Sequence, residues 1–360
     1  MPGCESENQP TPRQVVVKSK AMVARLWAAI RGAAASFVLA AAALARGILS
    51  DLSAPVAGVD GHPGQFIAGS YANQAGARPY KLYIPTGYAQ QRLPLIVMLH
   101  GCTQTADVFA HGTRMNGLAE ERQCFVLYPE QTHAASRLRC WNWFRRGDQR
   151  RDQGEPAILA GMTREVMHRY RIDPDRVYVA GLSAGGAMAA VMGTAYPEIY
   201  AAVGVHSGLA CGSAHDLASG IAAMRGRPAP VSGERGSAPG APVTPTIVFH
   251  GDRDKTVHPR NGEHLVSRSL QQSGASSAEA SVEQARAPGG HAYTRSIHRN
   301  AAGHVVVEYW RVHGGGHAWF GGSSRGSYTD PRGPDAAREM IRFFYQNAFE
   351  QRSYDRFRVA

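Results

Sequence analysis

Ser183 stands in a sequence context that is typical of a catalytic nucleophile. It is the serine of a G-x-S-x-G motif whose glycines are Gly181 and Gly185. An apolar run at 177–180 has the length of a buried strand, and small residues in a helical pattern follow the motif. On such a strand–turn–helix, the two glycines leave room for a tight turn that exposes the serine hydroxyl. The context therefore favours a nucleophile over the alternative, a Gly/Ser-rich turn without chemistry.

Two aspartates downstream of Ser183 are candidates for the acid that a serine nucleophile needs. A serine hydroxyl requires an adjacent base, which is itself oriented by a third group. In folds with this motif the chain order is Ser, then Asp or Glu, then His. The strand pattern at 246–250 runs into Asp252 and Asp254, which places both at the strand edge where ligands bind. We predict that Asp254, further out in the loop, orients the base, and that Asp252 braces the turn.

The base is expected among the histidines that follow the acid: His258, His264, His291, His298, His304, His313 and His317. The first two are too close to the acid in sequence, and His291 has no strand pattern ahead of it. His298 and His304 flank a hairpin turn, where we expect them to be solvated. His317 follows the glycines 314–316 directly after a strand pattern. A glycine-rich loop can swing an imidazole over the sheet edge, so His317 is predicted as the base and His313 is the second choice.

An oxyanion hole needs two preorganised backbone N–H groups. Ala184, the residue after the nucleophile, is predicted to supply one of them at the start of the following helix. The second is expected from the loop at 101–103, which follows an early apolar strand pattern, and Cys102 is the residue predicted there. No metal or cofactor is needed for this chemistry.

The pattern of elements around these residues predicts one doubly wound, mostly parallel α/β sheet. Apolar runs predict strands at 80–84, 94–99, 125–128, 200–205 and 246–250, and a hairpin of 293–298 with 304–312. Helices are predicted at about 106–122, 155–170 and 334–349, with a turn at Asp173-Pro174. The stretches 226–245 and 273–290 are rich in small and polar residues and are interpreted as loops.

Composition limits the other classes of function. The chain has 360 residues, a hydrophobic fraction of 44% and a net charge of +11. Arginines cluster around the tryptophans at 137–151. This pattern can indicate nucleic-acid binding, but no nucleic-acid motif accompanies it, so a solvated loop is the preferred interpretation. Five cysteines are too few for a disulfide scaffold, and their spacing does not suggest zinc.

The N-terminal region has features of a secretory signal peptide. The apolar run 32–45 is uncharged, basic residues precede it, and Ala43-Leu44-Ala45 is an A-x-A cleavage signal. The run is too short to span a bilayer comfortably. The alternative is an Ala-rich helix packed on the domain of a cytoplasmic protein. We predict a signal-like, anchor-like or flexible segment at 1–58, a catalytic domain at 59–350 and a basic tail at 351–360.

Several motifs, in this order along the chain, resemble the poly(3-hydroxybutyrate) depolymerase family of α/β-hydrolase esterases, which borders on the feruloyl and acetylxylan esterases. They are Leu99-His-Gly-Cys-Thr-Gln104, Leu127-Tyr-Pro-Glu-Gln131, Cys140-Trp-Asn-Trp-Phe144, Gly154-Glu-Pro156, the serine motif with the residues up to Met188, His250-Gly-Asp-x-Asp-x-Thr-Val257, Gly315-Gly-His-Ala-Trp319 and Gly326-Ser-Tyr-Thr-Asp330. The resemblance implies the triad Ser183, Asp254 and His317. It also implies that Cys102 lies at the oxyanion hole and pairs with Cys140; the alternative is two unpaired, buried thiols.

The resemblance also bears on the substrate. It implies a serine carboxylic ester hydrolase that cleaves hydroxyalkanoate esters or oligoesters through an acyl-enzyme, with a feruloyl- or acetylxylan-type carbohydrate esterase as the alternative. Polymer-degrading members often append a separate binding domain, and we expect a lone catalytic domain here, which argues against action on crystalline polyester. Trp143 and Trp319 are predicted to offer flat apolar faces to an ester chain, with core packing as the alternative. A non-catalytic binding protein on the same scaffold would usually lack a triad member, and none is missing.

Overall fold

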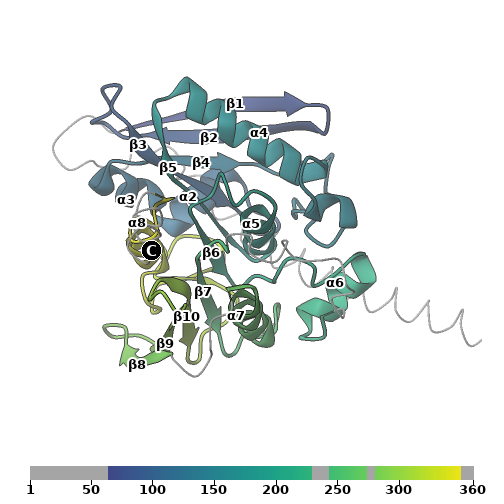
Figure 1. Cartoon of the computed structure of the whole chain (residues 1–360), viewed down its shortest axis with the longest axis vertical. Coiled ribbons are helices and arrows are strands. Elements are labelled where there is room, and N and C mark those ends of the chain that lie inside the picture. The colour runs from purple at the N-terminus through teal and green to yellow at the C-terminus, as the bar shows by residue number, and fades with distance from the viewer. Residues whose placement is uncertain (1–63, 229–242, 274–279, 350–360) are drawn as a thin grey trace, which may run out of the picture. The chain divides into compact units, whose positions relative to one another are not determined.

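The computed structural model describes residues 64–228, 243–273 and 280–349. Its main sheet has ten strands, which in chain order are β1 (Gln65–Asn73), β2 (Gly76–Ile84), β3 (Leu93–Leu99), β4 (Phe125–Pro129), β5 (Ile172–Leu182), β6 (Ala202–His206), β7 (Thr246–Gly251), β8 (Ser281–Arg286), β9 (Ala292–Arg299) and β10 (Val305–Val312). In space the order is β1-β2-β4-β3-β5-β6-β7-β10-β9-β8 (Figure 1). From β4 to β10 in this order the strands run parallel, while β1, β2, β9 and β8 pair antiparallel at the two sides.

Helices cover both faces of this sheet. The helices are α2 (Ala106–Thr113), α3 (Met115–Arg122), α4 (Gly154–Arg169), α5 (Ala184–Ala195), α6 (Leu217–Met224), α7 (Arg260–Ser273) and α8 (Ala336–Tyr345), with a 3-10 helix η1 (Arg146–Gln149) and a small parallel pair, β11 (Trp319–Phe320) with β12 (Thr329–Asp330). Buried side chains of α4, α5 and α7 pack with one face of the sheet, and those of α2, α3 and α8 pack with the other. The structure is thus the doubly wound α/β fold that the sequence predicts.

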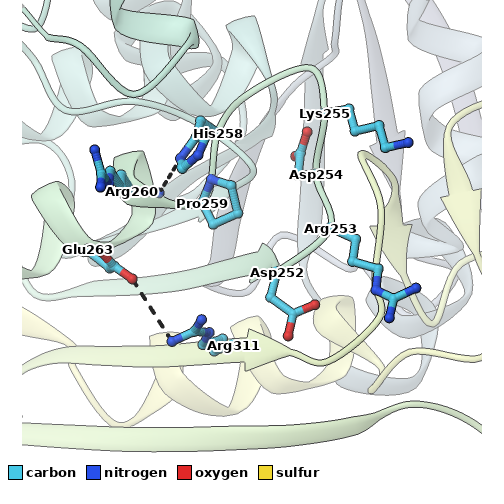
Figure 2. Close-up of a pocket in the computed structure, with 9 residues that line it drawn as sticks. All are labelled: Asp252, Arg253, Asp254, Lys255, His258, Pro259, Arg260, Glu263 and Arg311. Carbon is cyan, nitrogen blue, oxygen red and sulfur yellow. Dashed lines mark hydrogen bonds and ion pairs between the residues drawn. The ribbon is translucent and has the colours of Figure 1, made fainter.

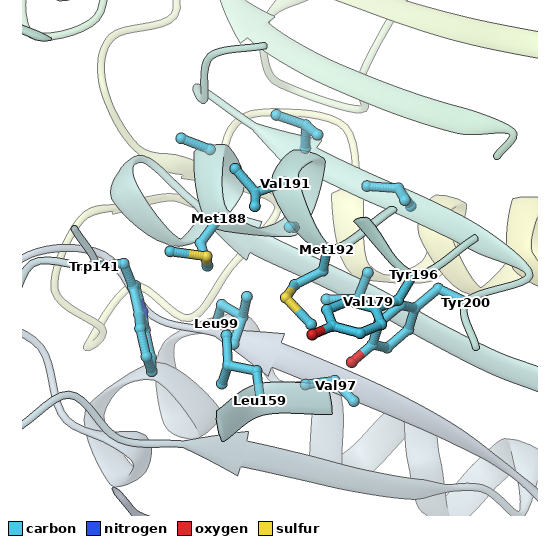
Figure 3. Close-up of a cluster of buried hydrophobic side chains, with 14 of the residues drawn as sticks. Val97, Leu99, Trp141, Leu159, Val179, Met188, Val191, Met192, Tyr196 and Tyr200 are labelled. Atoms are coloured by element: carbon cyan, nitrogen blue, oxygen red, sulfur yellow. The ribbon is translucent and has the colours of Figure 1, made fainter. Parts of the chain in front are cut away.

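Strand β3 shows why the sheet must be covered on both sides. All of its residues are buried, and its side chains alternate between the faces. Leu95, Val97 and Leu99 join the cluster with α4 and α5, whereas Ile96 and Met98 join the cluster with α2 and α8. Figure 3 shows the first of these clusters, in which the β3 side chains lie opposite Leu159, Met188 and Met192 from α4 and α5. Continuous apolar strands of this kind are characteristic of parallel sheets.

The structure corrects several of the predicted elements. The Asp173-Pro174 step lies within β5, where a shift of register between Leu93 and Leu95 of β3 makes room for an irregular segment. The predicted loop 273–290 contains β8, an edge strand with mostly exposed residues and therefore no apolar stripe to reveal it. The predicted helix 106–122 is divided at Arg114, which adopts a left-handed conformation (φ 57°) between α2 and α3.

Some features lie beyond what the sequence pattern predicted or what the structure describes. The strand β1 and the helix α6 were not predicted. The predicted segments 1–58 and 351–360, and with them the A-x-A signal, lie outside the described residues, so these boundaries stay predictions. Within the part of the chain that the structure describes, no helix is long and apolar enough to cross a membrane.

Candidate active site

Ser183 lies on a sharp turn between β5 and α5. Its backbone has φ 58° and ψ −118°, a conformation that residues other than glycine rarely adopt. A Cβ on Gly181 would lie 2.4 Å from the backbone of Gly185, and a Cβ on Gly185 would lie 2.0 Å from the carbonyl oxygen of Leu99. Only glycine fits at both positions, so the motif forces the elbow geometry. The elbow is fixed further because the Ser183 N–H donates to the His206 carbonyl at 2.9 Å.

Asp254 and His317 are brought together from two loops. Asp254 follows β7 and His317 follows β10, which are parallel neighbours. The distance from His317 Nδ1 to Asp254 Oδ2 is 2.7 Å. The other carboxylate oxygen, Oδ1, accepts hydrogen bonds from the N–H groups of Thr256 (2.9 Å) and Val257 (2.8 Å). Asp254 is 4% exposed, and its carboxylate is therefore held in one orientation.

The electrostatic surroundings keep Asp254 ionised. Burial acts to raise its pKa, but hydrogen bonds from His250 and His317 outweigh burial and hold the pKa well below its usual value. An ionised carboxylate at Nδ1 fixes the tautomer of His317, with the proton on Nδ1, and leaves Nε2 as a proton acceptor. A histidine in this state has the properties of a general base.

The alternative acid and the second-choice base form a separate pair. Asp252 Oδ2 lies 3.0 Å from His313 Nδ1, and Asp252 Oδ1 accepts from the Gly314 N–H at 2.7 Å. The second ring nitrogen of His313 lies 2.9 Å from the hydroxyl of Thr294. Both nitrogens of His313 therefore have partners, and Asp252 ties the loop after β7 to the loop after β10, which is a bracing contact.

The loop after β3 carries the predicted oxyanion residue Cys102. It is joined to Cys140 by a disulfide bond, so the pairing that the resemblance implies is present. Gln104 closes the turn because its side-chain oxygen accepts from the Gly101 N–H at 2.9 Å, and its amide nitrogen donates to the Ser327 hydroxyl at 3.0 Å. Thr103 donates its N–H to the Leu138 carbonyl at 2.7 Å. The loop is thus fastened to the segments around residues 140 and 327.

Trp319 does not lie where the sequence interpretation placed it. It is fully buried, and its ring contacts His206 (5.0 Å between centroids) and Phe109 (5.6 Å, edge to face). No face of the ring is open to a substrate, because the ring is packed in the core. The prediction that Trp319 binds an ester chain is therefore wrong. Trp143 is 6% exposed and belongs to the buried cluster on the α5 face. Its contact with substrate stays a prediction, and its position favours the alternative, core packing.

His298, expected to be solvated, is also buried, with 7% of its surface exposed. It lies on β9, whose central place between β8 and β10 the sequence pattern did not reveal. Other polar residues near the site were not singled out from the sequence, among them Glu155, His206 and His250, all of them buried. The only signal that pointed to them was their presence in the family-like motifs or beside a strand end.

A pocket of about 520 Å³ opens beside the acid loop (Figure 2). Its lining is mostly charged and consists of Asp252, Arg253, Asp254, Lys255, His258, Pro259, Arg260, Glu263 and Arg311. Figure 2 shows Arg253 and Lys255 on the opposite side from His258 and Arg260, so these side chains do not converge. Sites for small ligands are usually lined by apolar side chains. This pocket is therefore a charged depression next to Asp254 and lacks the character of an acyl site.

The fold is that of an α/β-hydrolase. The acetyl xylan esterase from Aspergillus awamori has a similar structure, with a TM-score of 0.58 at 20% identity, covering 75% of this chain and 94% of that chain. The model of the family described as esterase PHB depolymerase matches residues 78–289, which is more than half of the chain. The chain belongs to this family of carboxylic ester hydrolases.

Two curated relatives indicate the range of the family. The chain is 31% identical over 242 residues to poly(3-hydroxyalkanoate) depolymerase C of Paucimonas lemoignei, an alignment that covers 65% of this chain and 57% of that protein. It is 28% identical over 195 residues to the probable acetylxylan esterase A of Aspergillus clavatus, covering 50% of this chain and 61% of that protein. The chain thus spans about three fifths of the length of each relative.

Proposed function

We propose that the protein is a serine esterase that hydrolyses hydroxyalkanoate esters or oligoesters, with Ser183 as nucleophile, His317 as base and Asp254 as the acid that orients it. The observation that carries this proposal is the 2.7 Å contact between His317 Nδ1 and Asp254 Oδ2, on the strand edge at which the elbow presents Ser183. The elbow geometry and the family membership support the same assignment.

The mechanism follows from this arrangement. Ser183 Oγ attacks the ester carbonyl carbon while His317 Nε2 takes the hydroxyl proton, and Asp254 stabilises the imidazolium that forms. When the tetrahedral intermediate collapses, His317 returns the proton to the departing alcohol and an acyl-enzyme remains. A water molecule, deprotonated by His317, then attacks the acyl carbonyl, and the acid product leaves with Ser183 restored.

The negative oxygen of the tetrahedral intermediate needs donors, and we assign the N–H groups of Ala184 and Cys102 to this role. Ala184 is the first residue of α5, and the first N–H groups of a helix have no partner within it. Within residues 64–228, 243–273 and 280–349, the Cys102 N–H donates no hydrogen bond. The disulfide and the Thr103–Leu138 hydrogen bond support a fixed position for this donor.

For the substrate, a hydroxyalkanoate ester is favoured by the 31% identity to a poly(3-hydroxyalkanoate) depolymerase. An acetylxylan-type ester is the second candidate, favoured by the 28% identity to a probable acetylxylan esterase. We further propose that the protein is exported, since disulfides persist mainly in oxidising compartments and Cys102 and Cys140 are bonded.

Substitution of the three residues tests the catalytic assignment. We expect Ser183→Ala, Asp254→Asn and His317→Ala each to lower kcat by at least about 1,000-fold while the protein stays folded. Double variants should be little worse than the most damaging single one, because the three groups act as a unit. Turnover of hydroxybutyrate oligomers, acetylated xylan, feruloyl esters and short p-nitrophenyl esters is the measurement.

The matched control is Asp252→Asn, which alters the neighbouring Asp–His pair and leaves Asp254 intact. We expect this variant to keep kcat within about tenfold of the wild type, since its role is to brace a turn. Inactivation by Asp252→Asn together with full activity of Asp254→Asn would refute the choice of acid. Turnover of acetylated xylan alone would replace the hydroxyalkanoate assignment by the second candidate.

A further inference from the structure

Two buried histidines lie beneath the proposed catalytic residues and have no role in the mechanism above. His206 is the last residue of β6 and His250 lies near the end of β7, and these strands are parallel neighbours. Both side chains are fully buried. Each ring uses its Nε2 atom to bind a loop that carries one of the proposed catalytic residues.

His206 links the elbow to the loop of the base. Its backbone carbonyl accepts the Ser183 N–H at 2.9 Å, and its ring Nε2 accepts the Phe320 N–H at 3.0 Å. Phe320 lies shortly after His317 in the chain, on β11. The ring is stacked between Phe249 and Trp319, with centroid distances of 5.7 and 5.0 Å. Because Nε2 accepts a hydrogen bond, the ring proton must reside on Nδ1.

His250 holds the acid loop with the opposite tautomer. Its Nε2 lies 2.8 Å from the Val257 carbonyl oxygen and 3.5 Å from Asp254 Oδ2. Both neighbours are acceptors, so Nε2 must carry the proton. Its Nδ1 is buried and has no hydrogen-bond partner among the residues that the structure describes. The ring abuts α7, where a Cβ on Gly262 would come within 3.1 Å of Nδ1. A second proton on this ring would therefore be a buried donor without an acceptor.

We propose that His206 and His250 are positioning residues, which fix the base loop and the acid loop relative to the elbow through one accepting and one donating Nε2 atom. This inference rests on the proposed function of Ser183, Asp254 and His317. Displacement of a catalytic group by about 1 Å can lower a rate by about 100-fold, so two anchors below the site have a direct kinetic consequence.

The charges around Asp254 determine what each anchor contributes. The titratable groups that face it are His250 from β7, His317 from the loop after β10 and, at longer range, His206 from β6. Asp252, which lies on the same loop as Asp254, is bound to His313. Burial keeps the pKa of His206 well below its ordinary value, so His206 stays neutral in the working range. The protonated Nε2 of His250 lies 3.5 Å from Asp254 Oδ2 and helps to lower the pKa of the carboxyl group, whereas His206 does not touch the carboxylate.

Glutamine and leucine substitutions separate the hydrogen bond from the volume of the ring. A glutamine amide can donate at position 250 and accept at position 206, whereas leucine can do neither. We expect His206→Gln and His250→Gln to keep kcat within about fivefold of the wild type. We expect His206→Leu and His250→Leu to lower kcat on the order of 10–100-fold with KM little changed. Equal activity of the leucine and glutamine variants at both positions would overturn the proposal.

The pH profile of kcat/KM distinguishes positioning from a general loss of structure. Removal of the His250 donor leaves Asp254 more basic, which favours the imidazolium of His317, so His250→Leu should move the acidic limb to higher pH. His206→Leu should lower kcat/KM with the limb unmoved. The fraction of unfolded protein is measured by near-UV circular dichroism. A positioning role would be contradicted if activity fell only in proportion to this fraction and the pH profile of both leucine variants stayed unmoved.

Three further variants keep the outcome interpretable. If the leucine variants do not fold, His206→Asn and His250→Asn replace them, because the shorter amide cannot reach the Nε2 partners, and the same kinetic results are expected. Ser183→Ala is measured in parallel. Activity of Ser183→Ala would refute the proposed function itself, whereas an inactive Ser183→Ala together with fully active leucine variants would refute only the role of the two histidines.

Discussion

Glu155 is a buried carboxylate, 3% exposed, that holds the segment between the disulfide and α4. It accepts hydrogen bonds from the backbone N–H and the side-chain amide of Asn142, both at 2.7 Å, and from the side-chain amide of Gln131. The Arg78 guanidinium lies 3.3 Å away. Burial raises the pKa of Glu155, and the hydrogen bonds from Asn142 and Gln131 act in the opposite direction by favouring the charged form.

Removal of this carboxylate should therefore be costly. We expect Glu155→Ala to lower the free energy of unfolding by about 3–5 kcal/mol, because Arg78 and Asn142 are left buried without their acceptor. Urea denaturation is the measurement. Glu165→Ala on the exposed face of the same helix is the control, with an expected change within about 0.5 kcal/mol. Similar values for the two variants would mean that the network contributes little to stability.

The residue scale also shows what a sequence can predict about a site. Ser183, Asp254 and His317 could be predicted as a candidate triad because a motif, a strand end and a glycine-rich loop each mark one of them. Glu155, His206 and His250 were not recognisable, since their partners are side chains and backbone groups that only the folded chain brings close, and no local pattern encodes such contacts. Trp319 was misplaced for the same reason. The sequence around an aromatic residue beside a glycine-rich loop is the same whether the ring packs into the core or faces the substrate.

At the scale of elements, the disulfide joins the loop after β3 to the segment before η1. The two cysteines are separated by 38 residues. Closing a loop of this size is worth roughly 3–4 kcal/mol of stability through restriction of the unfolded chain. The same bond fastens the loop that carries the proposed Cys102 donor, so its loss should affect turnover as well as stability.

We expect Cys140→Ser to lower the free energy of unfolding by roughly 3–4 kcal/mol and to lower kcat, with Cys211→Ser as the control. Cys211 is a free cysteine of intermediate burial and should change kcat little. Guanidinium denaturation and steady-state kinetics provide the two measurements. An unchanged kcat in a destabilised Cys140→Ser variant would mean that the disulfide does not position the loop that carries the proposed Cys102 donor.

The elements themselves were predictable to the extent that they are buried. Strands β3, β4 and β7 and the part of β5 at 177–182 are fully buried, and each was found near its predicted place. Strands β1 and β8 have mixed or exposed residues along their length, so no apolar stripe marked either of them, and the region of β8 was interpreted as a loop. The break at Arg114 depends on a single left-handed residue whose side chain bonds Gly321 and Asp335, a tertiary contact that periodicity does not encode.

At the scale of the whole described unit, Asp–His contacts connect the loops at the carboxyl edge of the sheet. Asp252 binds His313, Asp254 binds His317, and Asp330 lies 2.8 Å from His291. Partial burial acts to raise the pKa of Asp330, but hydrogen bonds from Arg332 and His291 outweigh it and lower the pKa to about 2. The same balance lowers the pKa of Asp252 and Asp254.

These pKa shifts predict how the stability of the fold depends on pH. A carboxylate whose pKa is lower in the folded than in the unfolded state stabilises the fold above about pH 4, and the contribution is lost as pH falls. For Asp330 the loss should extend down to about pH 2. We expect Asp330→Asn to be less stable than the wild type at neutral pH and to have a flatter profile of Tm between about pH 4 and 2. Asp107→Asn, on an exposed ion pair with Lys81, is the control, and parallel profiles for Asp330→Asn and the wild type would contradict the assignment.

The backbone of Ser183 has a consequence for how this chain can evolve. With φ at 58°, the position imposes a steric cost of about 1–3 kcal/mol on a residue with a side chain, a cost that glycine avoids. A screen for thermal tolerance alone would therefore reward glycine at this position and discard the hydroxyl. Laboratory evolution of more durable variants must keep ester turnover under selection at every round, since at this one codon durability and chemistry are opposed.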